Sequence, residues 1–331
     1  MPCPIVILNP IAGRGARLWP HFESELSQRG VLVRATQKSG DAGRLAREAI
    51  ESGADFLIAA GGDGTLGEVA GAIIESGQRR VRLGVLPLGT GNDFARTLGV
   101  WGEPKRALDA LFEGETRRVD VGRIECEGQT RVWLNVAGCG FDSLVARRIN
   151  GWGRRKTMRY ARGLAAYLLA TACELADFRA FDLTLELDGE RIETAAILCA
   201  VGNAQSYGGG MRVCPDAHLD DGLFDVCVVQ KTSRSEFLRA FPSVFAGKHT
   251  HHPRVMMRRC RLVRIESKQS VPVLADGEIV GSAPFRCEIL PYSLEVCGPR
   301  AKKCSSQTGE MSGQQAELRP TVDRRLSIDR Q

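Results

Sequence analysis

Gly61-Gly62-Asp63-Gly64-Thr65 links an apolar, strand-like run at 55–60 to a helical pattern at 65–76. The apolar residues of that pattern recur with the spacing of one helix face: Leu66, Val69, Ala70, Ile73 and Ile74. Glycines in such a turn let backbone N–H groups approach an anion closely, and the helix that follows adds its positive N-terminal end. The stretch therefore predicts a phosphate-binding loop between a strand and a helix.

The residues on both sides of this loop alternate between strand and helix patterns. Strand-like runs lie at 5–8, 31–36, 55–60 and 82–86, and helical patterns lie between them at 16–29, 41–52 and 65–76. Alternation of this kind is typical of a parallel sheet covered by helices on both faces. It predicts an α/β nucleotide-binding domain over residues 1–120.

From about residue 121 short β-like runs dominate, at 132–136, 181–187, 194–201, 223–229, 261–266, 271–275 and 285–290. Asp188-Gly189 and Asp276-Gly277 have the composition of tight hairpin turns. Two helical stretches, 157–176 and 235–245, interrupt the runs. We therefore expect a mostly antiparallel β-sandwich over residues 121–299. The polar, aperiodic residues 300–331 predict a disordered tail.

Composition indicates a soluble globular protein, with 43% hydrophobic and 25% charged residues among 331. The net charge of +6 suits an anionic partner such as nucleotide phosphates or an anionic membrane surface. The longest uncharged, mostly apolar run, 163–173, is shorter than the roughly 20 residues that span a bilayer. No secretory signal pattern is present, and the eleven scattered cysteines favour reduced, buried thiols. We expect a cytoplasmic protein that is peripheral to the inner face of the membrane.

Three Gly-rich segments follow strands of the predicted parallel sheet, at 9–15, 61–65 and 88–93. Any one of them could be only a tight turn. In an open α/β sheet, however, the loops at the carboxyl ends of the strands lie together, and ligands bind there. None of the three matches the P-loop or the dinucleotide fingerprint, so the usual NTPase and NAD-dehydrogenase interpretations lose support.

Asp63 is unusual in a phosphate-binding loop because its carboxylate would repel phosphates unless a cation lay between them. Mg²⁺ takes oxygen ligands and bridges phosphates, so Asp63 predicts bound Mg²⁺. Thr65 and Glu68 have the spacing of a capping box with Thr65 as the N-cap, a role compatible with phosphate binding at the same helix end.

The ordered set of motifs carries a resemblance to a known family. It comprises Asn9-Pro10-x-Ala12-Gly13, Gly61-Gly62-Asp63-Gly64-Thr65-x-x-Glu68, Leu86-Pro87-x-Gly89-Thr90-x-Asn92-Asp93-Phe94-Ala95, Asn135-Val136-x-Gly138-x-Gly140-Phe141-Asp142, Cys214-Pro215-Asp216-Ala217-His218-Leu219-Asp220-Asp221-Gly222-Leu223 and Asp276-Gly277-Glu278. Over roughly residues 4–298 the chain resembles the diacylglycerol kinase catalytic domain family, which includes bacterial soluble lipid kinases and the sphingosine and ceramide kinases. The second of these motifs alone is shared with NAD kinases.

The resemblance implies a role for each matching position. It implies ATP contacts at Asn9, Pro10, Ile11, Ala12, Gly13, Thr36, Gly62, Asp63, Gly64, Thr65, Leu66, Gly67, Glu68 and Thr90. It implies that Asp221 binds a structural Mg²⁺ together with the backbone carbonyls of His218 and Leu223. Arg14 and Asp120 would belong to a charge network between that metal and the ATP site. Glu278 would be the general base that accepts the proton of the lipid hydroxyl.

The residues alone leave simpler interpretations open. Asp276-Gly277-Glu278 has the pattern of a polar hairpin turn, and Asp220-Asp221-Gly222 that of an acidic turn. A stretch at 147–162 contains seven basic residues and no acidic one. It could dock on anionic lipid headgroups or be a solvated helix face. Nucleic acid is not expected, because interleaved aromatic residues are missing. A histidine cluster at 249–252 lacks neighbours that would complete a zinc site.

Together these features predict an ATP- and Mg²⁺-dependent lipid kinase that phosphorylates a lipid hydroxyl, on diacylglycerol or a related lipid, at the membrane surface. Two alternatives remain: an NAD kinase-like enzyme with a soluble substrate, and a non-catalytic nucleotide- or lipid-binding regulator. Family members are often dimeric, so a homodimer stays open.

Overall fold

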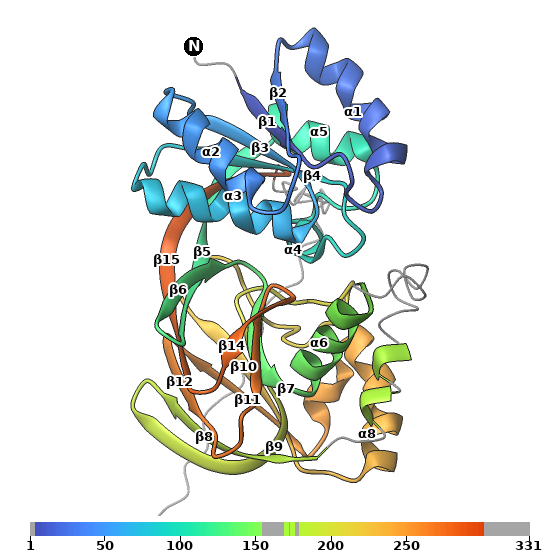
Figure 1. The fold of residues 1–331 in the computed structure, drawn as a ribbon, viewed down its shortest axis with the longest axis vertical. Coiled ribbons are helices and arrows are strands. Elements are labelled where there is room, and N and C mark those ends of the chain that lie inside the picture. The colour runs from blue at the N-terminus through green and yellow to red at the C-terminus, as the bar shows by residue number, and fades with distance from the viewer. Residues whose placement is uncertain (1–3, 154–168, 172, 176–178, 301–331) are drawn as a thin grey trace, which may run out of the picture. The chain divides into compact units, whose positions relative to one another are not determined.

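The computed structural model describes residues 4–153, 169–171, 173–175 and 179–300 (Figure 1). Residues 1–300 form one compact unit. Most of the helix expected at 157–176, most of the basic stretch at 147–162 and all but the first residue of the tail expected at 300–331 lie outside the described residues. No helix in the described part of the chain is long and apolar enough to cross a membrane.

The N-terminal half contains the predicted parallel sheet. Its strands are β1 (Ile5–Leu8), β2 (Leu32–Ala35), β3 (Phe56–Gly61) and β4 (Arg82–Pro87), and they lie in the order β4-β3-β1-β2. The helices are α1 (Gly15–Gln28), α2 (Asp41–Glu51), α3 (Asp63–Ser76), α4 (Asp93–Leu98) and α5 (Pro104–Phe112). All three strand pairs are parallel, which confirms the α/β expectation.

Helices cover both faces of this sheet because every central strand is apolar on both sides. Ile5 and Ile7 of β1 join a core with α2 and α3, whereas Val6 and Leu8 join a core with α1 and α5. Strands buried on both faces read as continuous apolar runs, as β1 and β3 do in the sequence.

The C-terminal half is a mostly antiparallel β-sandwich, also as expected. Its strands are β5 (Glu115–Cys126), β6 (Gln129–Trp133), β7 (Val136–Gly140), β8 (Phe181–Leu187), β9 (Glu190–Gly202), β10 (Phe224–Gln230), β11 (Val255–Cys260), β12 (Leu262–Glu266), β13 (Pro272–Ala275), β14 (Glu278–Ser282) and β15 (Phe285–Gly298). Helices α6 (Phe141–Gly153) and α8 (Arg234–Ala240) and the 3₁₀ helices η2 (Phe241–Ala246) and η3 (Lys248–His251) accompany them.

Two long strands join the halves. β15 pairs with β5 in antiparallel fashion from Phe285 to Gly298, and its far end pairs in parallel with β4 through Glu295 and Val296. In Figure 1 β15 runs from the sandwich up to the N-terminal sheet. β5 therefore crosses the boundary expected at 120, and the last strand completes the N-terminal sheet.

Several elements differ from the expectation. The run at 132–136 divides into β6 and β7, and α4, α5, α6, β11 and β14 were not predicted. The helix expected at 235–245 ends as an α-helix at Ala240 and continues as η2, because the ring of Pro242 would clash with the preceding turn of an α-helix. Both Asp-Gly hairpins are confirmed, since each of the two aspartates and glycines has a positive φ.

The cysteines in the described part of the chain agree with the expectation of free thiols. Nine are unpaired, and eight of these are buried. Burial raises the pKa of Cys227 and Cys260 to about 12, so these thiols stay protonated and act as small apolar side chains.

Candidate active site

The four loops that leave the carboxyl ends of β1 to β4 meet at one edge of the sheet. Asn9, Thr36, Gly62 and Thr90 each stand in one of these loops, although the sequence predicted Thr36 as the last residue of a strand. The backbone N–H of Asn9 donates to the carbonyl of Ala60 at 2.8 Å, so the first loop is fastened to the third.

Two glycines allow the loops to close on one another. A Cβ atom at Gly13 would collide with the hydroxyl of Thr90, and a Cβ atom at Gly89 would collide with the backbone of Gly62. The backbones of three loops therefore lie closer together than side chains would permit. Closely packed glycine-rich backbone of this kind is typical of loops that hold phosphates.

The expected capping box between Thr65 and Glu68 is wrong. Helix α3 begins at Asp63 with Gly62 as its N-cap, three residues earlier than a capping box with Thr65 as the N-cap requires. The Thr65 hydroxyl accepts a hydrogen bond from the Asn9 amide at 3.2 Å, again joining the first and third loops.

Glu68 serves a different helix. Its two carboxylate oxygens accept hydrogen bonds from the backbone N–H groups of Gly40 and Gly43, at 3.0 and 3.2 Å. Glu68 thus caps the start of α2 from the side. The Leu66 side chain is packed into the core, so only its backbone lies near the loop surface. Pro10, Ile11 and Gly13 are exposed at this edge, and Gly67 faces the carboxylate of Asp276.

Unneutralised arginines stand beside the loops. The guanidinium groups of Arg14 and Arg96 lie 5.8 and 3.6 Å from the ring centre of Trp101. Burial lowers the pKa of Arg14, and the charges of Arg17 and Arg96 lower it further. Arg96 donates to the carbonyl of Gly91 and lies near enough to Asp93 to lower the pKa of that carboxyl. Within the described residues none of these arginines forms an ion pair, and the buried Nε of Arg14 has no hydrogen-bond partner. An anion between them would remove their mutual repulsion.

Carboxylates gather on the opposite side of the Asp63 loop. The carboxylate of Asp63 accepts a hydrogen bond from the Phe94 backbone N–H at 3.2 Å and from the Asn135 amide at 3.5 Å. Burial raises the pKa of Asp93, and the nearby charge of Asp63 raises it further. Asp93 is held by the backbone N–H of Gly209 at 2.9 Å.

Asp276, which the sequence marked only as a hairpin residue, is the third carboxylate of this group. It accepts hydrogen bonds from the backbone N–H groups of Leu134 and Asn135, both at 2.8 Å. Enclosure of its carboxylate raises its pKa to about 7, and the charge of Asp63 adds to this effect. The buried Oδ1 of Asn135 points into the same region and has no partner.

Glu278 lies one step farther along the β13–β14 hairpin, at the first position of β14. Its carboxylate faces the start of α3 at Gly64 and pairs with Arg131 at 3.6 Å. It lines a groove of about 280 Å³ together with Asp63 and Asp276. The structure therefore brings the predicted base to the predicted phosphate loop from the other half of the chain.

The main cleft, of about 500 Å³, lies between the halves. Residues of the phosphate loops and of the sandwich line it, among them Asp63, Thr90, Arg96, Asn135, Asp142, Tyr207 and Asp276. Burial raises the pKa of Asp142 to about 6, although hydrogen bonds from Ser143 and Tyr207 act to lower it.

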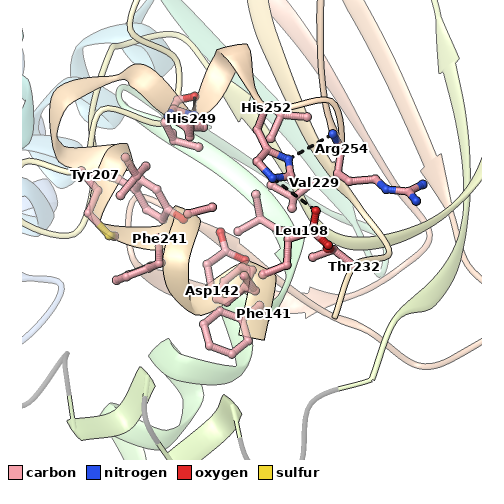
Figure 2. A pocket seen from close by; sticks show the side chains of 17 residues that line it. Phe141, Asp142, Leu198, Tyr207, Val229, Thr232, Phe241, His249, His252 and Arg254 are labelled. Atoms are coloured by element: carbon pink, nitrogen blue, oxygen red, sulfur yellow. Dashed lines mark hydrogen bonds and ion pairs between the residues drawn. The ribbon is translucent and has the colours of Figure 1, made fainter. Parts of the chain in front are cut away.

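A smaller apolar cavity of about 70 Å³ adjoins the cleft, because Asp142 and Tyr207 line both spaces. Figure 2 shows Phe141 and Asp142 at one end of this cavity and His249 and His252 at the other. The imidazole of His249 bonds the Val213 carbonyl at 3.0 Å, and burial lowers its pKa, so His249 is a neutral wall residue.

The structural Mg²⁺ was expected at the turn that contains Asp221. Asp221 accepts a hydrogen bond from the backbone N–H of Leu223 at 3.0 Å and pairs with Arg259. His218 is exposed. Asp120 is buried and accepts from the backbone N–H groups of Gly222 and Tyr292, at 2.7 and 2.8 Å.

Asp120 therefore lies next to the Asp221 turn. In the described part of the chain, no hydrogen bond or ion pair joins Asp120 to Arg14, and no group of three or more His, Cys, Asp or Glu side chains has a geometry that would hold a metal ion.

Known proteins share this arrangement. A family model described as the diacylglycerol kinase catalytic domain matches residues 4–124, and a model described as the YegS C-terminal NAD kinase beta sandwich-like domain matches residues 135–298. A curated diacylglycerol kinase of Mycobacterium tuberculosis (strain ATCC 25618 / H37Rv) is 36% identical over 301 residues, 89% of this chain and 94% of that protein. The chain belongs to the diacylglycerol kinase family.

Other comparisons agree with membership of the diacylglycerol kinase family. A curated diacylglycerol kinase of Staphylococcus aureus (strain Newman) is 33% identical over 298 residues, 89% of this chain and 91% of that protein. A crystal structure from Bacillus anthracis str. Sterne has a TM-score of 0.70 at 25% identity and covers 89% of this chain and 95% of that chain. Membership places the chain among the lipid kinases and confirms the resemblance seen in its motifs.

Sequence reasoning missed four side chains of the cleft: Asp93, Arg96, Asp142 and Asp276. Asp93, Asp142 and Asp276 stood inside motifs quoted for the diacylglycerol kinase family, so their positions were visible but their roles were not. Arg96 follows the third loop in α4, a helix of six residues that is too short to show a periodic pattern.

Proposed function

We propose that this protein transfers the γ-phosphate of ATP to the hydroxyl of diacylglycerol or a related lipid. The observation that carries the proposal is the cleft itself. Phosphate-binding loops from the N-terminal half and the carboxylates of Asp142 and Asp276 from the sandwich line one space, and an apolar cavity adjoins it. This combination suits a nucleotide on one side and an acceptor with a polar head and a hydrocarbon tail on the other.

ATP fits the loop edge for physical reasons. The close backbones of Gly13, Gly62 and Gly89 leave room for phosphate oxygens, and α3 directs its positive end toward them. Arg14 and Arg96 form no ion pair among the described residues, so a triphosphate would complete their pairing.

Mg²⁺ would bind beside Asp63 with the phosphates of ATP as further ligands, because the described carboxylates alone do not form a metal site. Asp63, Asp93 and Asp276 are close enough for the charge of Asp63 to raise the pKa of the other two, and the Asn135 carbonyl oxygen is unsatisfied. Hard oxygen ligands of this kind suit Mg²⁺, which supplies charge neutralisation between the carboxylates and the phosphates. The turn at Asp221, with the carbonyls of His218 and Leu223, is proposed as a second, structural Mg²⁺ site at which Arg259 competes.

The acceptor step requires one proton transfer. The acceptor oxygen forms a bond to the γ-phosphorus, the bond from that phosphorus to the β-phosphate oxygen breaks, and the hydroxyl proton passes to the carboxylate of Glu278. Glu278 is exposed enough to meet an incoming lipid and lies beside Gly64 at the phosphate loop. Asp276 is engaged by two backbone N–H groups, so we assign it a positioning role.

The lipid reaches the cleft from a membrane, so the proposal places the enzyme in peripheral contact with the inner face, where ATP is present. A hydrocarbon chain would enter the apolar cavity behind Asp142 and Tyr207. The acceptor hydroxyl would then remain in the main cleft near Asp63.

A substrate panel tests this function. The purified chain is incubated with MgATP and, separately, with diacylglycerol, phosphatidylglycerol, a sphingoid base and NAD, and products are identified by mass spectrometry. We expect a phosphorylated lipid whose formation requires Mg²⁺. The Asp63→Asn variant should form much less of it. Formation of NADP without any phosphorylated lipid would overturn the proposal.

A further inference from the structure

The segment formed by α8 and η2, residues 234–246, is apolar on two opposite faces. Its inward residues Phe237, Ala240, Phe241 and Val244 follow an i, i+3, i+4, i+7 stripe and line the apolar cavity. Its outward positions include Leu238, Pro242 and Phe245, and the side chains of Leu238 and Phe245 are 54% and 39% exposed. None of the residues of α8 or η2 is fully buried. The outward stripe therefore presents exposed apolar groups on this part of the described chain.

Four exposed basic residues lie within or next to this segment along the chain. Lys231, Arg234, Arg239 and Lys248 are exposed, and none of them forms an ion pair with a described acidic side chain. Glu236 is the one acidic residue of the segment, and it is engaged by Thr232 and by His252. The surface thus combines exposed apolar groups with unneutralised positive charge.

An aromatic row connects the outward face to the cleft. The ring centroids of Phe141 and Phe237 are 5.1 Å apart, those of Phe237 and Phe241 are 5.8 Å apart, and those of Phe241 and Phe245 are 6.4 Å apart. Phe141 precedes Asp142, which lines the main cleft. In Figure 1 α8 lies beside α6, the helix that begins at Phe141.

We propose that the outward face of α8 and η2 docks on an anionic lipid bilayer, with Leu238 and Phe245 inserted at the headgroup boundary. Exposed apolar side chains flanked by arginine and lysine are the pattern of interfacial segments that bind anionic membranes. A second copy of this chain is a poor occupant, because a two-fold interface would set the same basic residues against one another. Docking here brings the bilayer to the outer wall of the apolar cavity.

The inference rests on the proposed function only for what happens after docking, so vesicle binding is measured without ATP. The full chain is sedimented with phosphatidylcholine vesicles that contain or lack about 30% phosphatidylglycerol. We expect binding to the anionic vesicles only. Leu238→Gln with Phe245→Gln should lower the partition coefficient at least about tenfold. The double variant Arg234→Glu with Arg239→Glu should lower the partition coefficient by about fivefold or more for each arginine replaced.

A matched control uses the exposed apolar residues of the N-terminal edge strand. Leu32 and Val33 are 55% and 45% exposed, close to the values at the docking face. Leu32→Gln with Val33→Gln should leave vesicle binding unchanged. As a second measurement, the emission of Phe245→Trp should shift to shorter wavelength on anionic vesicles and stay constant on neutral ones.

Three outcomes would overturn the proposal: equal binding to neutral and anionic vesicles, unchanged binding of the Leu238/Phe245 variant, or loss of a dimer by that variant in sedimentation velocity. Turnover of a water-soluble, short-chain diacylglycerol separates docking from catalysis. The docking variants should retain it. Vesicle binding by a protein that phosphorylates no lipid would support docking and sink the proposed function.

Discussion

The carboxylate of Asp276 holds the backbone N–H of Asn135 at 2.8 Å and thereby sets the amide of Asn135 beside Asp63. The bond joins the β13–β14 hairpin to the chain that leads from β6 to β7, so two segments of the sandwich share one fixed position opposite the phosphate loop. This arrangement makes Asp276 a positioning residue whose removal should affect catalysis through its neighbours.

We therefore predict that Asp276→Asn lowers kcat by about 10²-fold, because misplacement of the groups around Asp63 by a fraction of an ångström costs that much. Steady-state kinetics with MgATP and lipid micelles measures it. Asp188→Asn is the matched control, since Asp188 begins the other Asp-Gly hairpin and holds the backbone N–H groups of Arg261 and Leu262 in the same way. Equal losses of kcat in both variants would contradict the positioning role.

Glu278→Gln should lower kcat by about 10²-fold or more with little change in the KM for ATP, as expected for loss of a general base. Arg131→Gln is its control, because it removes the ion pair at 3.6 Å and leaves the carboxylate in place. We expect that control to retain most of its turnover. A fully active Glu278→Gln variant would show that another group accepts the proton.

Arg96→Ala should raise the KM for ATP by about tenfold, since a charge-assisted contact to phosphate contributes about 1.5–3 kcal/mol. Arg82→Ala is the control. It also removes an arginine stacked on an aromatic ring, because Arg82 lies 4.5 Å from the ring centre of Phe56, and so tests whether that loss alone raises the KM for ATP. Its KM should stay that of the unmodified chain. Comparable KM changes in the two variants would remove Arg96 from the nucleotide site.

The buried carboxyl of Asp142 makes stability depend on pH. Burial raises its pKa from 3.8 to about 6, so the folded state binds the proton more tightly than the unfolded state does. Its contribution to the free energy of unfolding therefore falls as pH rises from about 4 to 6 and is constant above that, a total of about 3 kcal/mol.

Asp142→Asn should flatten this pH dependence, because an amide has no proton to lose between pH 4 and 6. Urea unfolding at several pH values, with the chain and the variant side by side, gives the comparison. The variant should gain stability relative to the unmodified chain as the pH rises through this window. Parallel curves for the two proteins would contradict the assignment to Asp142.

The proposed structural Mg²⁺ at Asp221 is tested by thermal unfolding without nucleotide. MgCl₂ should raise the Tm of the unmodified chain, because a cation bound only to the folded state stabilises it. The shift should vanish in Asp221→Asn and persist in Asp220→Asn, which removes the neighbouring exposed carboxylate. Arg259→Gln should enlarge the shift, since Arg259 pairs with Asp221 and would compete with the cation. A shift unaffected by Asp221→Asn would place the cation elsewhere.

Local sequence was sufficient for much of the fold. The runs that became β1, β3 and β4 are apolar on both faces, and the stripe of α3 is unambiguous, so the parallel sheet followed directly. The sandwich was visible as short runs with Asp-Gly turns between them. α4, of six residues, was not predicted, because so few turns cannot show a repeat.

The position of a candidate site residue was predictable where it stands in a Gly-rich loop after a strand, as at Gly62 and Thr90. It was not predictable where the role depends on a distant partner. Glu68 had the right spacing to cap its own helix, yet it caps α2, because the fold places Gly40 and Gly43 within reach. Asp276 and Asp63 are brought together only by tertiary structure, so no local pattern could reveal their shared charge.

The path of β15 has a consequence for synthesis on the ribosome. The N-terminal sheet lacks its fifth strand until Glu295 and Val296 of β15 emerge and pair with Arg82 and Leu83 of β4. The edge of β4 therefore stays open while the sandwich is translated. A stop codon before β15 would remove a strand partner from both halves at once, that of β4 in the first and that of β5 in the second.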